Sequence, residues 1–250
     1  MAEKPKLALS HSRLSDFNQC PRKFKLKYID KAKNMLIDDN QKSIHLVRGQ
    51  NVHKALEKYA ILKIAGNTNI PESSIAEVES TKPYIDKMIA EYESVLPESQ
   101  IAIDSDYNQV DWFSPLANWR AIFDLVSVSK PKSEAVIDDY KTGKLTDYDA
   151  GPSGFGQLHL SAMIALSLMP NIEVVRVNYL YVDHRKKIPS EFKQSSLPDL
   201  KIHFESEHRK VNAEVNFEPT KNKFCNYCDA TKAQCPYSNK IQTTTMSELG

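Results

Sequence analysis

The sequence has no apolar run close to the roughly 18 residues that a membrane-spanning helix needs. Its first residues, MAEKPKLALSHS, lack the apolar core of a secretory signal peptide. The net charge is only +1, from 33 Lys and Arg against 32 Asp and Glu, which argues against a surface that attracts polyanions everywhere. These absences predict a cytoplasmic protein without membrane contact, in which any polyanion would bind at a local basic patch.

The sequence also lacks a complete phosphate-binding P-loop. Residues 142–144 (TGK) match the end of that motif, but Asp138 stands where its first glycine should be and Leu145 follows the lysine. A nucleotide-hydrolysing motor is therefore excluded.

Cysteine is scarce, with four residues among 250. An intracellular compartment disfavours disulfides, so these thiols are interpreted first as ligands of a metal or cluster and second as core residues. A content of 41% hydrophobic and 26% charged residues is ordinary for a soluble globule, and we expect one core with insertions.

The most informative stretch is AVIDDYKTGK, residues 135–144, which has the apolar character of a strand. Side chains alternate along a strand, so Asp139 and Lys141 project to one side and Tyr140 to the other. Burying both charges is unfavourable unless they are paired or bound to a metal ion. The alternative is an exposed strand end with a solvated ion pair.

A second acid, Asp124, is embedded in the preceding apolar stretch WRAIFDLVSV. The turn signal at residues 130–133 predicts a hairpin that brings Asp124 close to Asp139. Asp138 is a competitor of Asp139 but lies on the face opposite Lys141. Two adjacent carboxylates repel each other, and one takes up a proton unless a divalent cation lies between them.

The pattern of an apolar strand with Asp124, a hairpin and Asp139-x-Lys141-Thr-Gly resembles the PD-(D/E)XK nuclease superfamily in its RecB-like branch. Ala121 replaces the small glycine that this branch usually has three residues before the first acid. The resemblance implies an α/β fold with a central mixed β-sheet flanked by helices, similar to restriction endonucleases. It implies a single nuclease domain over residues 1–250, with an N-terminal helical part over 12–63 and a catalytic sheet core over 105–183.

A helix is predicted over residues 48–63, with His53 leaning towards the same interior as Leu56. A lone histidine in this position is more often a core residue with a hydrogen-bond partner. The resemblance favours a different role, because Gly49 and His53 match a Gly-x-x-x-His pattern whose histidine binds metal in this branch.

Residues 10–31 predict a helix that begins near Ser12 and breaks near Pro21, with Cys20 on its inward side. The basic residues Arg22, Lys23 and Lys25 are interpreted either as a solvated face or as phosphate contacts of a nucleic acid. This stretch also resembles the N-terminal signature of RecB-like nucleases that carry an iron-sulfur cluster.

Three further cysteines, Cys225, Cys228 and Cys235, lie in a C-terminal segment over 216–240. The C-x-x-C spacing lets two thiolates hold one metal centre. With Cys20 they resemble the 4Fe-4S site that joins the N- and C-terminal segments of such nucleases. Four thiolates also suit Zn2+, because ligand type alone does not separate the two centres.

The remaining elements are predicted from periodicity. Helices are expected over 81–96 and 157–169, strands over 108–113 and 174–182, a loop over 144–156, and a hairpin with IHFES (202–206) as one strand. The resemblance marks Gln157 as a residue near the metal site, in a Gln-x-x-x-Tyr pattern whose tyrosine is Ser161 in this chain.

The resemblance implies a Mg2+- or Mn2+-dependent DNA exonuclease that prefers single-stranded ends. Lys141 positions water or stabilises the phosphate, as the lysine of the family does, and Gln157 supports it. The predicted metal ligands are His53, Asp124, Asp139 and the backbone carbonyl of Tyr140.

Two alternatives stay open from the sequence. One is a non-catalytic DNA-binding or scaffold module with a structural cluster. The other is a nuclease subunit that is active only with a helicase, an integrase or another recombination partner. The resembling standalone exonucleases act in CRISPR adaptation, recombination or phage DNA metabolism, so a phage origin is among the expectations.

Overall fold

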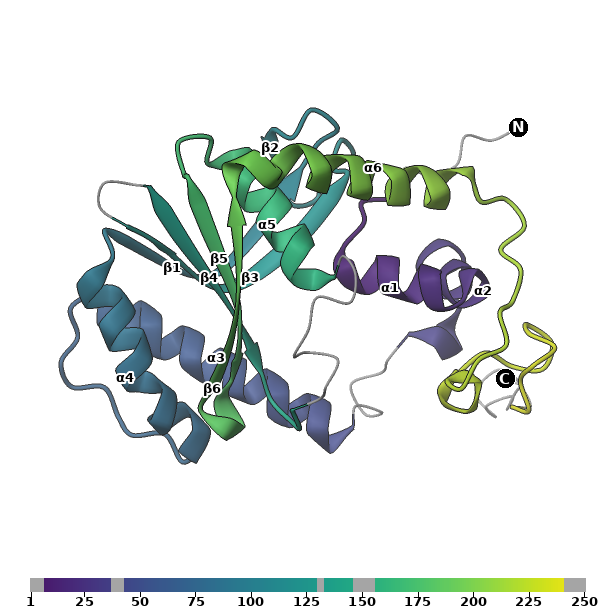
Figure 1. Ribbon diagram of the computed structural model, residues 1–250. Coiled ribbons are helices and arrows are strands. Elements are labelled where there is room, and N and C mark those ends of the chain that lie inside the picture. Colours follow the sequence, from purple (N-terminus) through teal and green to yellow (C-terminus); the bar gives the residue numbers. More distant parts are fainter. Residues whose placement is uncertain (1–6, 37–42, 130–132, 146–155, 241–250) are drawn as a thin grey trace. The chain divides into compact units, whose positions relative to one another are not determined.

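The computed structural model describes residues 7–36, 43–129, 133–145 and 156–240 (Figure 1). The chain forms two compact units. The sheet unit consists of Met1–Ser10 and Ser43–Glu205, and the cysteine unit consists of His11–Lys42 and Ser206–Gly250.

The sheet unit is built on a six-stranded sheet with the order β2-β1-β3-β4-β5-β6. Its strands are β1 (Ser94–Ile103), β2 (Gln109–Val110), β3 (Trp119–Val128), β4 (Glu134–Lys141), β5 (Val174–Tyr181) and β6 (Lys186–Lys193). Strands β4 and β5 are parallel and the other neighbours are antiparallel. The predicted α/β class with a mixed sheet is confirmed, as is the hairpin of β3 and β4.

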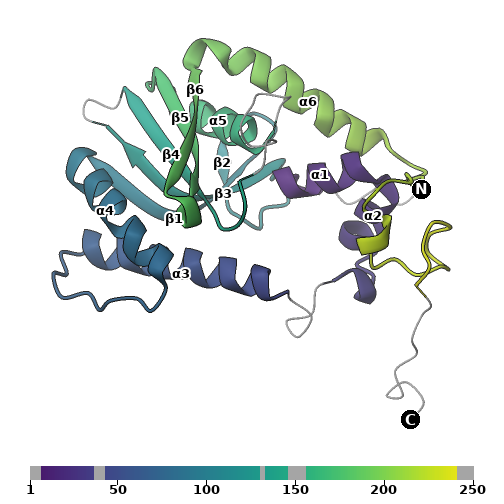
Figure 2. The same ribbon diagram turned by 60° about the horizontal axis from the view of Figure 1, so that its bottom comes forward.

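Helices lie on both sides of this sheet (Figures 1 and 2). On one side, α3 (Ile44–Ile64) and α4 (Ala76–Glu91) share a core with β3, β4 and β5. The side chain of Ser43 caps α3 by accepting a hydrogen bond from the Leu46 N–H at 3.2 Å. On the other side, α5 (Gln157–Leu168) is apolar around its circumference and therefore buried along most of its length.

Three predicted elements are wrong in type or extent. The helix expected over 81–96 ends at Glu91, and Ser94 already belongs to β1, where Val95 pairs with Ser127. The strand expected over 108–113 is reduced to β2. Residues 202–206 (IHFES) lie in α6 (Leu197–Ala213), because Leu200 and Phe204 are buried at the four-residue spacing of a helix face. Most of the loop predicted over 144–156 is outside the described residues.

In the cysteine unit, α1 (His11–Gln19) is followed by α2 (Pro21–Phe24) and a π-helical turn, Lys25–Ile29. The break predicted at Pro21 is confirmed, since proline lacks the N–H that would continue α1 but suits the first position of a new helix. Phe24 contacts the ring of Phe17 edge to face at 5.4 Å and stacks parallel to Phe217 at 6.4 Å. These rings join the two chain segments of the unit.

Across the described parts of the chain, no helix is both long and apolar enough to cross a membrane.

Candidate functional site

The end of β4 holds an acid and an amine in direct contact. Lys141 Nζ lies 2.7 Å from Asp139 Oδ2, because alternation along the strand directs both side chains to one face. Gln157, the first residue of α5, bridges them: its Nε2 donates to Asp139 Oδ1 at 2.5 Å, and its Oε1 accepts from Lys141 Nζ at 3.0 Å. Three residues expected at the site therefore form one connected group.

Asp124 on β3 connects this group to α3. Its Oδ2 accepts the backbone N–H of Tyr140 at 2.6 Å, and its Oδ1 lies 3.1 Å from His53 Nδ1. The β3–β4 register runs from Val128 with Ala135 to Leu125 with Asp138, so the Asp124 side chain takes the Tyr140 N–H where that pairing ends. The structure thus brings the four predicted side chains and Gln157 to one end of the β3–β4 hairpin.

Asp138 points to the opposite face, as strand alternation predicts. Its carboxylate is fully buried and accepts hydrogen bonds from Tyr84 OH at 2.9 Å and from Asn178 Nδ2 at 2.8 Å. Burial raises the pKa of Asp138 to about 6, although both hydrogen bonds oppose the shift. Asp138 is a structural carboxylate of the α3–α4 side and does not compete for the Asp139 position.

The electrostatics of the site reflect crowded acids in a buried environment. Burial raises the pKa of Asp139, and the charge of Asp124 raises it further, whereas the Lys141 ammonium lowers it. Burial lowers the pKa of His53, but the hydrogen bond to Asp124 and the charges of Asp124 and Asp139 outweigh it and raise that pKa above its usual value. The neighbouring carboxylates therefore favour the protonated form of the His53 imidazole.

Glu98 is a third acid near the site that sequence reasoning missed. It lies on β1 between the pairs Pro97–Leu125 and Ser99–Phe123, opposite Asp124, and adopts a positive φ of 44°. Its pKa is raised by burial and by the charges of Asp124 and Glu57. Its position depends on the β1–β3 register, for which the sequence carries no local signal.

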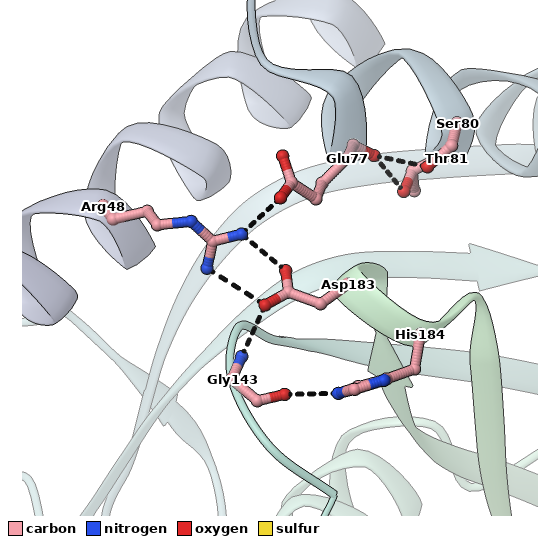
Figure 3. A network of polar contacts seen from close by, with 7 residues as sticks. All are labelled: Arg48, Glu77, Ser80, Thr81, Gly143, Asp183 and His184. Atoms are coloured by element: carbon pink, nitrogen blue, oxygen red, sulfur yellow. Dashed lines mark hydrogen bonds and ion pairs between the residues drawn. The ribbon is translucent and has the colours of Figure 1, made fainter.

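A network of polar contacts stabilises the turn that follows Lys141 (Figure 3). Arg48 on α3 donates to both carboxylate oxygens of Asp183 at 2.9 and 3.0 Å and to Glu77 of α4 at 2.5 Å. Asp183 accepts the Gly143 N–H at 3.0 Å, and His184 Nε2 lies 2.8 Å from the Gly143 carbonyl oxygen. One ion-pair cluster therefore links α3, α4 and the end of β5 to the turn after β4.

Gly49 lets α3 approach the same turn. A Cβ at this position would lie 2.9 Å from Thr142 Oγ1, closer than carbon and oxygen atoms normally approach. The predicted Gly-x-x-x-His pattern thus has a local physical reason: Gly49 allows the close contact, and one helical turn later His53 reaches Asp124.

The four cysteines gather around one pocket of the cysteine unit. Its volume is about 160 Å³, and its lining includes the four thiols together with Arg22 and Lys23. None of the thiols forms a disulfide. Cys20 Sγ accepts the Thr220 N–H at 3.4 Å, and Cys225 Sγ accepts the Asn222 N–H at 3.3 Å. Burial raises the pKa of Cys228, while the charge of Lys23 opposes this shift.

The basic residues predicted to bind nucleic acid have mixed surroundings. Lys23 is 2.7 Å from Asp16, and Lys25 is 2.7 Å from Asp30. Arg22 lines the cysteine pocket, where its Nε is buried without a hydrogen-bond partner. Their contact with nucleic acid stays a prediction.

Among the residues that the structure describes, no three His, Cys, Asp or Glu side chains are arranged to hold one metal ion. The oxygen atoms of Asp124 and Asp139 are engaged by Tyr140, His53, Lys141 and Gln157 as described. The residue types nevertheless fit their expected groups: carboxylates and an imidazole suit Mg2+ or Mn2+, and four thiols around one pocket, two of which accept backbone N–H bonds, suit an iron-sulfur or zinc centre.

The family model for the PD-(D/E)XK nuclease superfamily matches residues 8–236. No curated protein matches the sequence. A solved structure described as "Crystal structure of SSO0001" is 15% identical, with 97% of this chain and 90% of that chain covered and a TM-score of 0.42.

Proposed function

Because the chain belongs to the PD-(D/E)XK nuclease superfamily, we propose that it cleaves the phosphodiester bonds of DNA with Mg2+ or Mn2+. The observation that carries this proposal is the contact of Asp139 with Lys141 at 2.7 Å beside Asp124 at the end of the β3–β4 hairpin. The family-wide activity is that of a nuclease. The roles of these residues are our assignment.

Asp124, Asp139 and His53 would hold the metal ion, with the Tyr140 carbonyl as a further ligand. When bound, the ion lowers the pKa of a coordinated water and neutralises charge on the phosphate. Lys141 presents a compact positive charge that orients the attacking water or stabilises the phosphate in the transition state. Gln157 holds Asp139 and Lys141 in register through its two hydrogen bonds.

Cleavage of end-labelled oligonucleotides with and without Mn2+ tests this function. We expect the wild-type protein to cleave only with the metal, and Asp139→Ala to lose at least about a hundredfold in rate while still binding DNA. Asp138→Asn is the matched control, because this neighbouring acid faces away from Lys141. Equal cleavage by Asp139→Ala and the wild type would refute the assignment.

We place the activity in the RecB-like branch, as an exonuclease that prefers single-stranded ends. The support is the combination of His53 on a Gly-x-x-x-His helix with four cysteines from both ends of the described chain. A circular single strand gives the sharpest test, since an exonuclease leaves it intact and degrades its linear form. Dependence of any cleavage on an added helicase or integrase would instead identify a subunit of a larger complex.

We also propose that the cysteine pocket holds a 4Fe-4S cluster, with Zn2+ as the alternative. The support is the gathering of four thiols around one pocket, with hydrogen bonds from two backbone N–H groups to sulfur. Burial and the neighbouring cysteines raise the pKa of Cys228, and the Lys23 charge opposes this shift. An optical spectrum of freshly purified protein, with iron, sulfide and zinc analysis, decides between them. A colourless protein that contains one zinc ion would show that the site holds zinc and not an iron-sulfur cluster.

A further inference from the structure

Charge is divided unevenly between the two units. The two segments of the cysteine unit contain 14 Lys and Arg and 9 Asp and Glu, a net charge of +5, whereas those of the sheet unit contain 19 and 23, a net charge of −4. The near-zero charge of the whole chain hides this difference. The cysteine unit, and not the unit with the candidate catalytic acids, therefore has the charge that attracts a polyanion.

Three aromatic rings of the cysteine unit are exposed around a single pocket. Tyr227 is 82% exposed, Phe224 45% and Tyr237 43%, and all three line the pocket that the cysteines line. Exposed rings gathered in one place, within a segment of 14 residues, indicate a binding surface and not scattered apolar residues.

Cations accompany these rings. Lys223 Nζ lies 5.2 Å from the Phe224 ring centroid, and Lys221 Nζ lies 6.0 Å from that of Tyr237. The nearby acid Asp229 is paired with Lys240 at 2.5 Å, so it does not offset these lysines. Aromatic rings can stack on the bases of a single strand, and lysines can bind the phosphates of its backbone. This combination is typical of proteins that bind single-stranded nucleic acid.

Resting on the proposed nuclease function, we propose that Phe224, Tyr227 and Tyr237 form a stacking surface for the bases of single-stranded DNA. Lys221 and Lys223 hold the backbone of the same strand. The surface belongs to the cysteine unit alone, whereas the candidate catalytic residues belong to the sheet unit.

Fluorescence anisotropy of the full-length protein with two labelled strands tests this surface. One probe is a fluorescein-labelled 20-nucleotide oligo(dT), and the other is a strand of equal length and charge in which every site is abasic. All proteins carry Asp139→Ala, so that cleavage does not interfere. We expect Tyr227→Ala to weaken oligo(dT) binding about tenfold and to leave the abasic strand nearly unchanged.

Variants of the same surface separate stacking from charge. Tyr227→Trp retains a stacking ring and should bind oligo(dT) at least as tightly as its parent. Lys223→Gln should weaken both strands similarly and reduce the slope of log affinity against log salt by about 0.7. Phe113→Ala is the matched control, since Phe113 is 86% exposed but lies in the sheet unit, and it should change neither affinity.

Two results would overturn the proposal. One is an unchanged affinity for oligo(dT) in a Tyr227→Ala/Tyr237→Ala protein whose melting temperature equals that of its parent. The exposed rings would then be assigned to the binding of a protein partner. The other is an equal loss for both strands, which would show that the rings do not contact bases. Because the readout is binding, a wild-type protein without nuclease activity would refute the proposed function and not this surface.

Discussion

At the scale of single residues, Asp138 predicts a measurable pH dependence of stability. Its pKa is raised from 3.8 to about 6 by burial, so the folded protein retains this proton to a higher pH than the unfolded chain. Below about pH 4, protonated Asp138 makes its full contribution to the free energy of unfolding. This contribution decreases as the pH rises and is lost above about pH 6, a total loss of about 3 kcal/mol.

Replacing this carboxyl by a neutral amide removes the titration. The unfolding free energy of Asp138→Asn, relative to wild type, should therefore rise by about 2 kcal/mol between about pH 4.5 and pH 7.5. Urea unfolding of both proteins at several pH values measures it, and titrations common to both proteins cancel in the difference. A difference that does not vary with pH would mean that Asp138 does not titrate in this window.

Residue-level prediction from the sequence succeeded where one local rule was sufficient. Alternation along a strand places Asp139 and Lys141 together and turns Asp138 away, and the structure has this arrangement. Glu98 could not be found in this way. Its position opposite Asp124 follows from the pairing of β1 with β3 and from a positive φ, which are properties of the folded sheet.

At the scale of elements, the close contact of α3 with the turn after β4 can be tested at Gly49. In an ordinary helix interior, Gly→Ala stabilises by about 1 kcal/mol. At Gly49 the new Cβ would meet Thr142 Oγ1 at 2.9 Å. We expect the overpacking to dominate, so that Gly49→Ala destabilises by about 1 kcal/mol and slows cleavage by displacing the turn that follows Lys141.

A second substitution identifies the cause. Thr142→Ala removes the atom in the way, so Gly49→Ala in that background should show the ordinary helix stabilisation. Denaturant unfolding of the four proteins gives the coupling between the two positions. If the two substitutions have additive effects on the free energy of unfolding, the close contact with Thr142 does not cause the effect of Gly49→Ala.

Element prediction failed where a short segment satisfies two periodicities. The stretch IHFES alternates like a strand, yet Phe204 and Leu200 bury one face of α6 because the flanking residues continue the helical spacing. Strand β1 was missed because the predicted helix was extended to residue 96 and because Pro97 and Glu98 interrupt the apolar pattern of the strand. Long, continuously apolar segments such as β3 and α5 were predicted in the correct class.

At the scale of the whole molecule, the division into two units was not visible in the sequence. The cysteine unit is assembled from two segments that more than 160 residues separate, so neither its charge nor its aromatic surface stands out along the chain. Cysteine spacing linked the two ends only through the resemblance to iron-sulfur nucleases. The prediction of a single domain over residues 1–250 stays a prediction.

The two units should depend differently on their thiols. The sheet unit has a core of its own in which α3 and α4 pack on β3, β4 and β5, whereas one small cluster of the cysteine unit rests on Leu26, Met35 and Ala230 with the partly buried Cys228 and Cys235 packed against it. A small core needs a metal centre to remain folded, because binding energy becomes folding energy there. Cys225→Ser should therefore accelerate amide hydrogen exchange at least about tenfold over residues 11–36 and 206–240.

The same variant should leave exchange unchanged in strands β3, β4 and β5, since their hydrogen bonds belong to the sheet unit. Ser238→Ala serves as the control, because it removes a buried hydroxyl of the cysteine unit without removing a thiol. It should cause local exchange near Ala230, whose carbonyl accepts the Ser238 hydroxyl, without opening residues 11–36. If Cys225→Ser protects the cysteine unit as well as the wild type does, then the thiols do not hold that unit together, whatever metal the protein contains.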